Sequence, residues 1–354
     1  MSVGLAGMRA RLTVAWIAGT LAVGACAVAQ AAPPRERILI VAGASTYDYA
    51  RALVQAFGRV AARLQPSLEA QANGDARAAF CAGVGLGFPD AAVSAGQMSA
   101  AEQRACQASG VTPIELKLGL QGVAVAESAS AAPIALTRRA LFLAAARDVP
   151  GPNGELEPNP YRSWRAIDSK LPDRPIHLFV PPAQTSQSES WLDLVMRAGA
   201  RQMPALADLA ARDPAAFAAL ATAPRETGEV TVLVPEADLR SALAAAPEAL
   251  AIVDLGATGA LKPIAVEGAA PERAKAGGAY PLARPVYLYV KREHLGIVRS
   301  LGDFLTEAAG EPALGEGGYL AALGLVPLPA RERGAERERV VAVQAKAVTL
   351  ARNR

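Results

Sequence analysis

Apolar and polar positions alternate along this chain in blocks that predict strands and helices in turn. An apolar run over 38–43 predicts a buried strand that ends in the small-residue turn 44–46. Residues 47–64 then carry apolar side chains at helical spacing, among them Leu53 and Phe57, which predicts a helix. The chain therefore begins its folded part with a strand, a turn and a helix.

Apolar runs typical of strands and apolar positions at helical spacing also predict the rest of the secondary structure. Helices are expected at 75–81, 100–108, 138–146 and 189–196, and strands at 89–94, 114–118, 123–126, 176–180, 230–234 and 286–290. Ser99 is placed to cap the second of these helices, and the stretch 150–160, rich in Pro, Gly and Asn, is expected to be a surface loop. Alternating strands and helices predict an α/β fold with a mostly parallel sheet.

The first residues have the pattern of an export signal and are set aside from the fold. Arg9 and Arg11 precede an apolar stretch over 12–25, which is short for a bilayer span of about 20 residues. Small residues near 27–31 offer cleavage sites, so we expect 1–31 to be a signal peptide and the protein to be periplasmic. The alternative is a lipoprotein signal at Val23-Gly24-Ala25-Cys26, with a lipid anchor on Cys26.

Length and charge narrow the class of protein. About 320 residues remain after cleavage, a length at which chains divide into two domains. The net charge of +3 falls to +1 without Arg9 and Arg11. Such a balance gives no field that would favour nucleic acid or an anionic membrane surface.

Cysteine and histidine are scarce. Cys81 and Cys106 lie 25 positions apart, and an oxidising compartment favours a disulfide between them, worth about 3 to 4 kcal/mol; two separately buried thiols are the alternative. His177 is expected inside a strand and His294 at a solvated helix start, neither in a cluster of metal ligands.

Catalytic motifs are missing from the sequence. It contains no Gly-x-Ser-x-Gly elbow, no Walker loop and no His-Glu-x-x-His motif. A hydrolase or phosphatase would need a nucleophile-base pair or a metal cluster, and the pattern shows neither. We therefore expect a binding protein without a cofactor and not an enzyme.

Two turns that carry hydroxyl groups are the candidate ligand site. Ser45, Thr46 and Tyr47 form the first turn, and residues 185–188, with Thr185, Ser186 and Ser188, form the second. Each lies between a predicted strand and a predicted helix, where free backbone amides can hold an anion. Ser and Thr are also the usual N-caps, so plain helix capping is the alternative for each turn.

A series of further segments resembles a known family. They are 40–45, Phe80-Cys81 to Pro89-Asp90, Cys106 to Gly110-Val111, 141–144, Asn159-Pro160-Tyr161 to Trp164, Ile167-Asp168, 171–173, 280–285, and Gly318-Tyr319-Leu320 to 325–329. In order and spacing they resemble the periplasmic phosphate-binding proteins of ABC transporters, PstS-like members of the type II periplasmic-binding-protein superfamily.

The resemblance implies a two-lobed α/β fold with a discontinuous first lobe. Residues 36–120 and 283–354 would form lobe 1 and residues 121–282 lobe 2, with crossovers near 118–123 and 280–284. The implied ligand is phosphate or a related oxyanion, held by Ser45, Thr46, Tyr47, Ser94, Thr185, Ser186 and Ser188. The implied partner is the membrane permease of an ABC transporter, and the protein is expected to be a monomer.

The sequence departs from the family at several ligand positions. The family's glycine-rich loop appears here as Ala72-Asn73-Gly74-Asp75, and the turn at 185–188 contains no arginine. Losing one or two charge-assisted hydrogen bonds to an oxyanion costs about 2 to 5 kcal/mol. The alternative function is therefore a degenerate scaffold with an altered ligand or none, acting through a protein partner.

Overall fold

The computed structural model describes residues 37–61, 65–72, 74–128, 133–225, 230–232, 236–256 and 261–352. The expected signal peptide and Cys26 lie outside these residues. Residues 34–354 form one unit. Over the described residues, no helix has both the length and the apolar character needed to cross a membrane.

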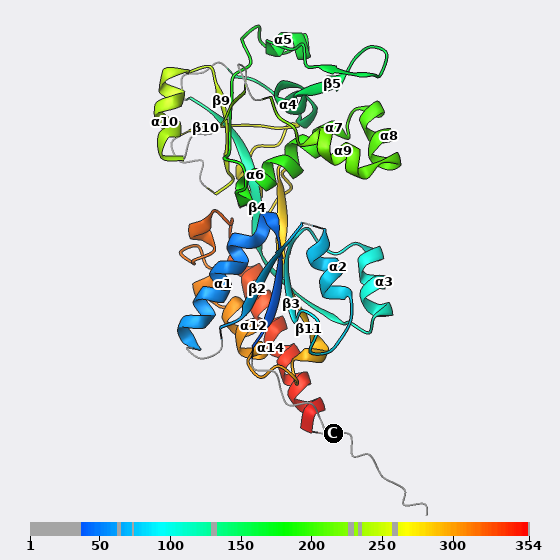
Figure 1. Ribbon diagram of the computed structural model, residues 1–354. Helices are drawn as coiled ribbons and strands as arrows, with labels where there is room; N and C mark the ends of the chain where they lie inside the picture. The colour runs from blue at the N-terminus through cyan, green and yellow to red at the C-terminus, as the bar shows by residue number, and fades with distance from the viewer. Residues whose placement is uncertain are drawn as a thin grey trace, which may run out of the picture. The chain divides into compact units, whose positions relative to one another are not determined.

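One mixed sheet runs through this unit (Figure 1). Its strands are β1 (Leu39–Gly43), β2 (Ser67–Gln71), β3 (Ala91–Ala95), β4 (Pro113–Glu127), β7 (Leu178–Val180), β8 (Val230–Val232), β9 (Leu250–Asp254), β10 (Lys262–Ile264) and β11 (Ala283–Lys291). The order is β2-β1-β3-β11-β4-β9-β7-β8, and β10 also pairs with β4. The two strands expected at 114–118 and 123–126 are one long strand, β4.

The sequence predicted a mostly parallel sheet, but the observed sheet is mixed. β1 is parallel to β2 and β3, and β7 is parallel to β8 and β9, but β11 is antiparallel to both β3 and β4, and β4 is antiparallel to β9. The periodicity of a strand does not depend on its partner's direction, so the sequence pattern could not distinguish these cases.

Helices cover the sheet on both faces. They are α1 (Tyr47–Val60), α2 (Asp75–Cys81), α3 (Ala100–Ala108), α4 (Arg138–Ala145), α5 (Trp164–Ile167), α6 (Ser186–Trp191), α7 (Ala198–Ala200), α8 (Pro204–Arg212), α9 (Pro214–Ala221), α10 (Glu236–Ala245), α11 (Glu272–Lys275), α12 (Leu301–Ala308), α13 (Glu311–Leu314) and α14 (Ala330–Arg352). Short 3-10 helices are η1 (Ala44–Thr46), η3 (Arg292–His294) and η4 (Ala321–Leu323), and η2 (Leu192–Arg197) is a π-helix between α6 and α7.

Part of the expected surface loop is ordered as a hairpin. β5 (Asp148–Pro150) and β6 (Leu156–Pro158) pair antiparallel across the predicted loop 150–160. The turn residues Pro152, Asn153 and Gly154 lie between these strands, and Gly154 has a φ of 79°. The predicted turn is therefore confirmed, while its flanking residues form the strands β5 and β6 where the sequence predicts a loop.

Buried side chains form three clusters. Two of them, on opposite faces of the same strands, draw on residues 38–118 and 286–340 and are together called the first core; the third, the second core, draws on 123–282, with Val326 added. In the first core, Ile40 and Ala42 of β1 face α1 and α12, while Val41 faces α2 and α3. Figure 1 shows α1 and the pair α2 and α3 on opposite sides of β1 and β3.

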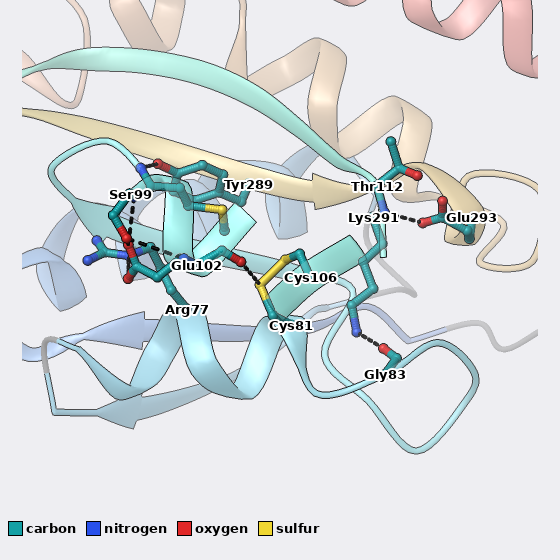
Figure 2. The surroundings of a disulfide bond; sticks show 11 residues. Arg77, Cys81, Gly83, Ser99, Glu102, Cys106, Thr112, Tyr289, Lys291 and Glu293 are labelled. Carbon is teal, nitrogen blue, oxygen red and sulfur yellow. Dashed lines mark hydrogen bonds and ion pairs between the residues drawn. A yellow bond between two sulfur atoms is a disulfide. The ribbon is translucent and has the colours of Figure 1, made fainter. Parts of the chain in front are cut away.

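Where the chain passes between the two cores, two segments of its backbone lie very close together. A Cβ atom on Gly122 would lie 2.1 Å from the Leu282 carbonyl oxygen, so only glycine permits this approach of β4 to the segment before β11. The first core is completed by the disulfide Cys81–Cys106, which joins α2 to α3 and confirms the predicted pairing (Figure 2).

Candidate functional site

The first hydroxyl turn is buried at the end of β1. Ser45 and Thr46 of η1 are 1% and 0% exposed. The Thr46 hydroxyl lies 3.0 Å from the Gly43 carbonyl and 2.9 Å from the Val93 carbonyl, so its proton serves backbone acceptors. The Ser45 hydroxyl instead meets a side chain from the far end of the sequence, because Arg284 Nη2 donates to its oxygen at 3.0 Å.

Sheet register places Arg284 beside this turn. Arg284 is the second residue of β11 and lies directly opposite Gln121 of β4. When the Gln121 amide nitrogen donates to the Ser45 carbonyl at 2.9 Å, its oxygen accepts from Arg284 Nη2 at 3.2 Å. Gln121 of β4 therefore contacts both Ser45 and the Arg284 guanidinium and orients them relative to each other.

A carboxylate from the second core faces the same guanidinium. Arg284 Nη2 lies 2.9 Å from Asp193 Oδ2, and Asp193 also pairs with Arg197 one turn along η2. The Arg284 and Asp193 side chains are 21% and 15% exposed, so their ion pair is shielded from water but not sealed.

The second hydroxyl turn meets the first. Thr185 caps α6, since its hydroxyl oxygen accepts from the Ser188 amide at 3.0 Å, and it also donates to the Pro182 carbonyl. The Ser186 hydroxyl points across to α1 and donates to Asp48 Oδ2 at 2.6 Å. It also lies 3.4 Å from the Ala44 carbonyl, so the two turns are in direct contact.

A cleft of about 260 Å³ opens beside this contact. Its lining comes from both cores and includes side chains with hydroxyl, amide and charged groups. The lining residues are Asp48, Tyr49, Arg51, Gly122, Thr185, Ser186, Gln187, Ser190, Asp254 and Leu323. Arg51 Nη2 pairs with Asp48 Oδ1 at 2.7 Å. Burial, and then the charges of Asp254 and Asp48, raise the pKa of Tyr49, so its phenol keeps its proton.

Of the predicted ligand residues, only Thr185 and Ser186 belong to the lining of this cleft, while Ser45, Thr46, Tyr47, Ser94 and Ser188 lie outside it. Ser94 is buried and accepts from Arg77 Nη1 at 2.8 Å. Tyr47 packs against the first core, and Ser188 contributes its amide to the Thr185 cap. The structure thus brings Ser45, Thr185 and Ser186 together and gives the others local partners.

Sequence reasoning missed the charged residues of the site. Arg284 was noted only as part of the landmark 280–285, while Asp48, Arg51, Asp193 and Asp254 were not singled out. Asp48 and Arg51 follow the first turn within one helical turn, a spacing that could have drawn attention to them. No group of three or more His, Cys, Asp or Glu side chains suited to a metal ion occurs in the described part of the chain.

Comparison with known proteins decides the family. The family PBP_like_2, described as a PBP superfamily domain, matches residues 27–311, which is most of the chain. The chain belongs to the PBP superfamily. A search of curated protein sequences finds no match.

Solved structures show the same fold for this PBP superfamily member. A possible phosphate-binding protein from Planctomyces limnophilus has a TM-score of 0.66 at 14% identity, covering 88% of this chain and 99% of that one. An ABC-type phosphate transport receptor from Vibrio cholerae has 0.54 at 13%, covering 83% and 100%, and PstS from Borrelia burgdorferi has 0.53 at 11%, covering 79% and 95%. The fold is that of the type II periplasmic binding proteins.

Proposed function

We propose that this chain is the substrate-binding component of a phosphate-type ABC uptake system and binds phosphate or a related oxyanion in the cleft. The observation that carries the proposal is the contact of Arg284 Nη2 with Ser45 Oγ, beside the point where Ser186 meets the first turn. Guanidinium and hydroxyl groups are the donors that oxyanions prefer, and arginine can bind two oxygens at once.

The fold supports this role. Two structures that share it are named as a phosphate transport receptor and a possible phosphate-binding protein. The division of the cores supports lobes made of 36–120 with 283–354 and of 121–282, which would close over the ligand. The protein would be exported to the periplasm, act as a monomer, deliver its ligand to a membrane permease and catalyse no reaction.

The proposed ligand set gives each residue a distinct task. Ser45, Ser186 and Arg284 would donate to the oxyanion directly. Thr46 and Thr185 would shape the two turns through their backbone contacts, and Tyr47, Ser94 and Ser188 would support these segments. With Asp254 in the lining, a ligand oxygen that carries a proton would also find an acceptor.

Isothermal titration of the full mature chain with inorganic phosphate, arsenate and sulfate tests the proposal. We expect binding of at least one of these anions, weakened roughly 10- to 100-fold by Arg284→Gln through loss of a charge-assisted donor. Arg104→Gln is the matched control, because Arg104 is exposed on α3, a helix that contributes no residue to the cleft lining or to the contacts of Ser45 and Ser186. The absence of heat with every anion at millimolar concentration would overturn the oxyanion assignment.

A second candidate function is a scaffold that acts through a protein partner without an oxyanion. The observation in its favour is that Ser186 and Arg284 already bind Asp48 and Asp193. Small-angle scattering separates the two candidates. A radius of gyration that changes with added phosphate supports the transport role, whereas one that stays constant supports the scaffold.

A further inference from the structure

Two carboxylates of the chain occupy donors that an oxyanion would use. Asp48 accepts from the Ser186 hydroxyl at 2.6 Å, and Asp193 accepts from Arg284 Nη2 at 2.9 Å. A carboxylate resembles a bound oxyanion in charge and in its hydrogen-bond acceptors. Each contact is therefore chemically the contact expected between this site and its ligand.

Both contacts also join segments that belong to different cores. Asp48 lies on α1, whose Ala50, Leu53 and Phe57 are buried in the first core. Ser186 begins α6, whose Trp191 is buried in the second core. Breaking the Asp48 and Ser186 contact would remove a direct side-chain link between the two cores.

Asp193 forms a second link between the two cores, through Arg284 of β11. It lies on η2, where Val195 and Met196 are buried in the second core, while Arg284 contacts Ser45 at the edge of the first. The same Arg284 nitrogen thus reaches Ser45 Oγ and Asp193 Oδ2, so an oxyanion at Ser45 would compete with Asp193 for it.

Each carboxylate also pairs with an arginine of its own helical segment, which holds it in place. Arg51 pairs with Asp48, and Arg197 pairs with Asp193, in each case on the same helical segment. Arg51 is 54% exposed, so its pairing is screened by water and is the weaker of the two. A displaced carboxylate would therefore keep a partner, which lowers the cost of its displacement.

We propose that Asp48 and Asp193 act as internal oxyanions that link the two cores in the absence of ligand and that a ligand must displace. This proposal rests on the proposed function for its ligand, but the link between the cores does not require any ligand. It makes these two aspartates determinants of affinity, because each favours the state in which the donors are already bound.

The test replaces each carboxylate by an amide of the same size. Asp193→Asn and Asp48→Asn are titrated with inorganic phosphate beside the wild type. We expect Asp193→Asn to bind phosphate roughly 10- to 100-fold more tightly, as expected for removal of one charge-assisted competitor, and Asp48→Asn to show a smaller gain. Asp208→Asn is the matched control, since Asp208 is exposed on α8 and absent from the cleft lining.

A second measurement needs no ligand. Small-angle scattering of the Asp48→Asn/Asp193→Asn double variant without added anion should give a larger radius of gyration than the wild type. Ser186→Ala removes the donor instead of the acceptor, so it should also increase the radius but should not increase phosphate affinity. Circular dichroism confirms that each variant is folded, and the single variants serve if the double variant is not.

The outcomes separate this proposal from the proposed function. If no variant binds an anion but the double variant opens, the internal link stands and oxyanion transport fails. If phosphate binds and neither aspartate substitution changes affinity or radius beyond the Asp208→Asn control, oxyanion binding stands and the internal link is overturned.

Discussion

Charged side chains have different structural roles near the first hydroxyl turn and around the loop that follows α2. Near the first hydroxyl turn, Arg284 and Asp193, whose side chains are 21% and 15% exposed, form an ion pair that joins different cores. Around the loop that follows α2, Asp90, Lys291 and His294 are 0%, 0% and 1% exposed and belong with the first core alone. Burial strengthens an electrostatic contact and raises the cost of leaving it unmade, so the second region is built to remain fixed.

The buried cluster illustrates how completely these groups are paired. Asp90 Oδ2 accepts from the Leu39 amide at 2.6 Å, and Asp90 Oδ1 lies 2.6 Å from His294 Nδ1. The Gly85 amide donates to His294 Nε2 at 3.0 Å, which assigns the proton to Nδ1 and makes it the donor to Asp90. The loop after α2 is thereby attached to β1 and η3.

Two parallel links attach α3 to the same region. Figure 2 shows the Arg77–Glu102 ion pair and the Cys81–Cys106 disulfide bridging α2 and α3 one helical turn apart. Lys291 Nζ donates to the Gly83 carbonyl at 2.5 Å and lies 5.3 Å from the ring centroids of Phe80 and Phe88. We expect substitutions here to lower stability without altering the cleft, and cleft substitutions to do the reverse.

Asp90→Ala should have the largest effect on stability. It leaves the Leu39 amide and His294 Nδ1 without this buried acceptor, which should lower the free energy of unfolding by about 4 kcal/mol. Urea unfolding followed by circular dichroism measures the change. Asp173→Ala, at a side chain that is 70% exposed, is the control and should change stability little. A large loss of phosphate affinity in a folded Asp90→Ala protein would break the distinction between the two regions.

Removing the disulfide should have the next largest effect. The Cys81→Ala/Cys106→Ala variant should lose about 3 kcal/mol of unfolding free energy, the usual contribution of a bridge that closes a loop of this size. A reductant should lower the stability of the wild type toward that of the variant and leave the variant unchanged. Equal stability of the two proteins under oxidising conditions would show that the other links between α2 and α3 suffice.

Glu102 should give the smallest effect and a defined pH dependence. Burial alone would raise its pKa, but hydrogen bonds from Ser99 and Arg77 outweigh burial and hold the pKa of Glu102 below its ordinary value. Its contribution is then present above the ordinary value and is lost as pH falls through the lower pKa of the folded state. Glu102→Gln should cost about 1 kcal/mol at pH 7, because it removes the charge that pairs with Arg77, while glutamine can still accept from the Ser99 amide.

The pH series itself provides the check. The difference in unfolding free energy between wild type and Glu102→Gln should shrink as pH falls from 7 toward 3. Glu338→Gln, at an exposed position on α14, should show no such trend. A difference that stays constant over this range would mean that the side chain acts through packing and not through its charge.

Local features of the fold could be predicted because their causes are local. The bounds of α2 and α3 agree with the prediction, and Ser99 and Glu102 form the capping box three residues apart. The disulfide followed from two cysteines in a chain that is expected to be exported, and the two hydroxyl turns followed from strand-to-helix boundaries. In each case the deciding contacts lie within a few residues, or the number of possible partners is very small.

Long-range partners could not be predicted in the same way. His294 was expected in a solvated helix start but is buried against Asp90, 204 residues away, because η3 follows β11 into the first core. Arg284 reaches Ser45 across 239 residues only because β11 pairs with β4 in one register. Shifting that register by one residue would turn the side chain to the other face.

The sequence by itself thus determined the α/β class, the two hydroxyl turns, the disulfide and the resemblance to phosphate-binding proteins, since these depend on local patterns and their order. Only the tertiary structure decided which charges meet those turns. Arg284, Asp193 and Asp48 come together through strand register and the packing of helices from different cores. Their contacts are not encoded in any local spacing, and under the proposed function they would determine how tightly an oxyanion is held.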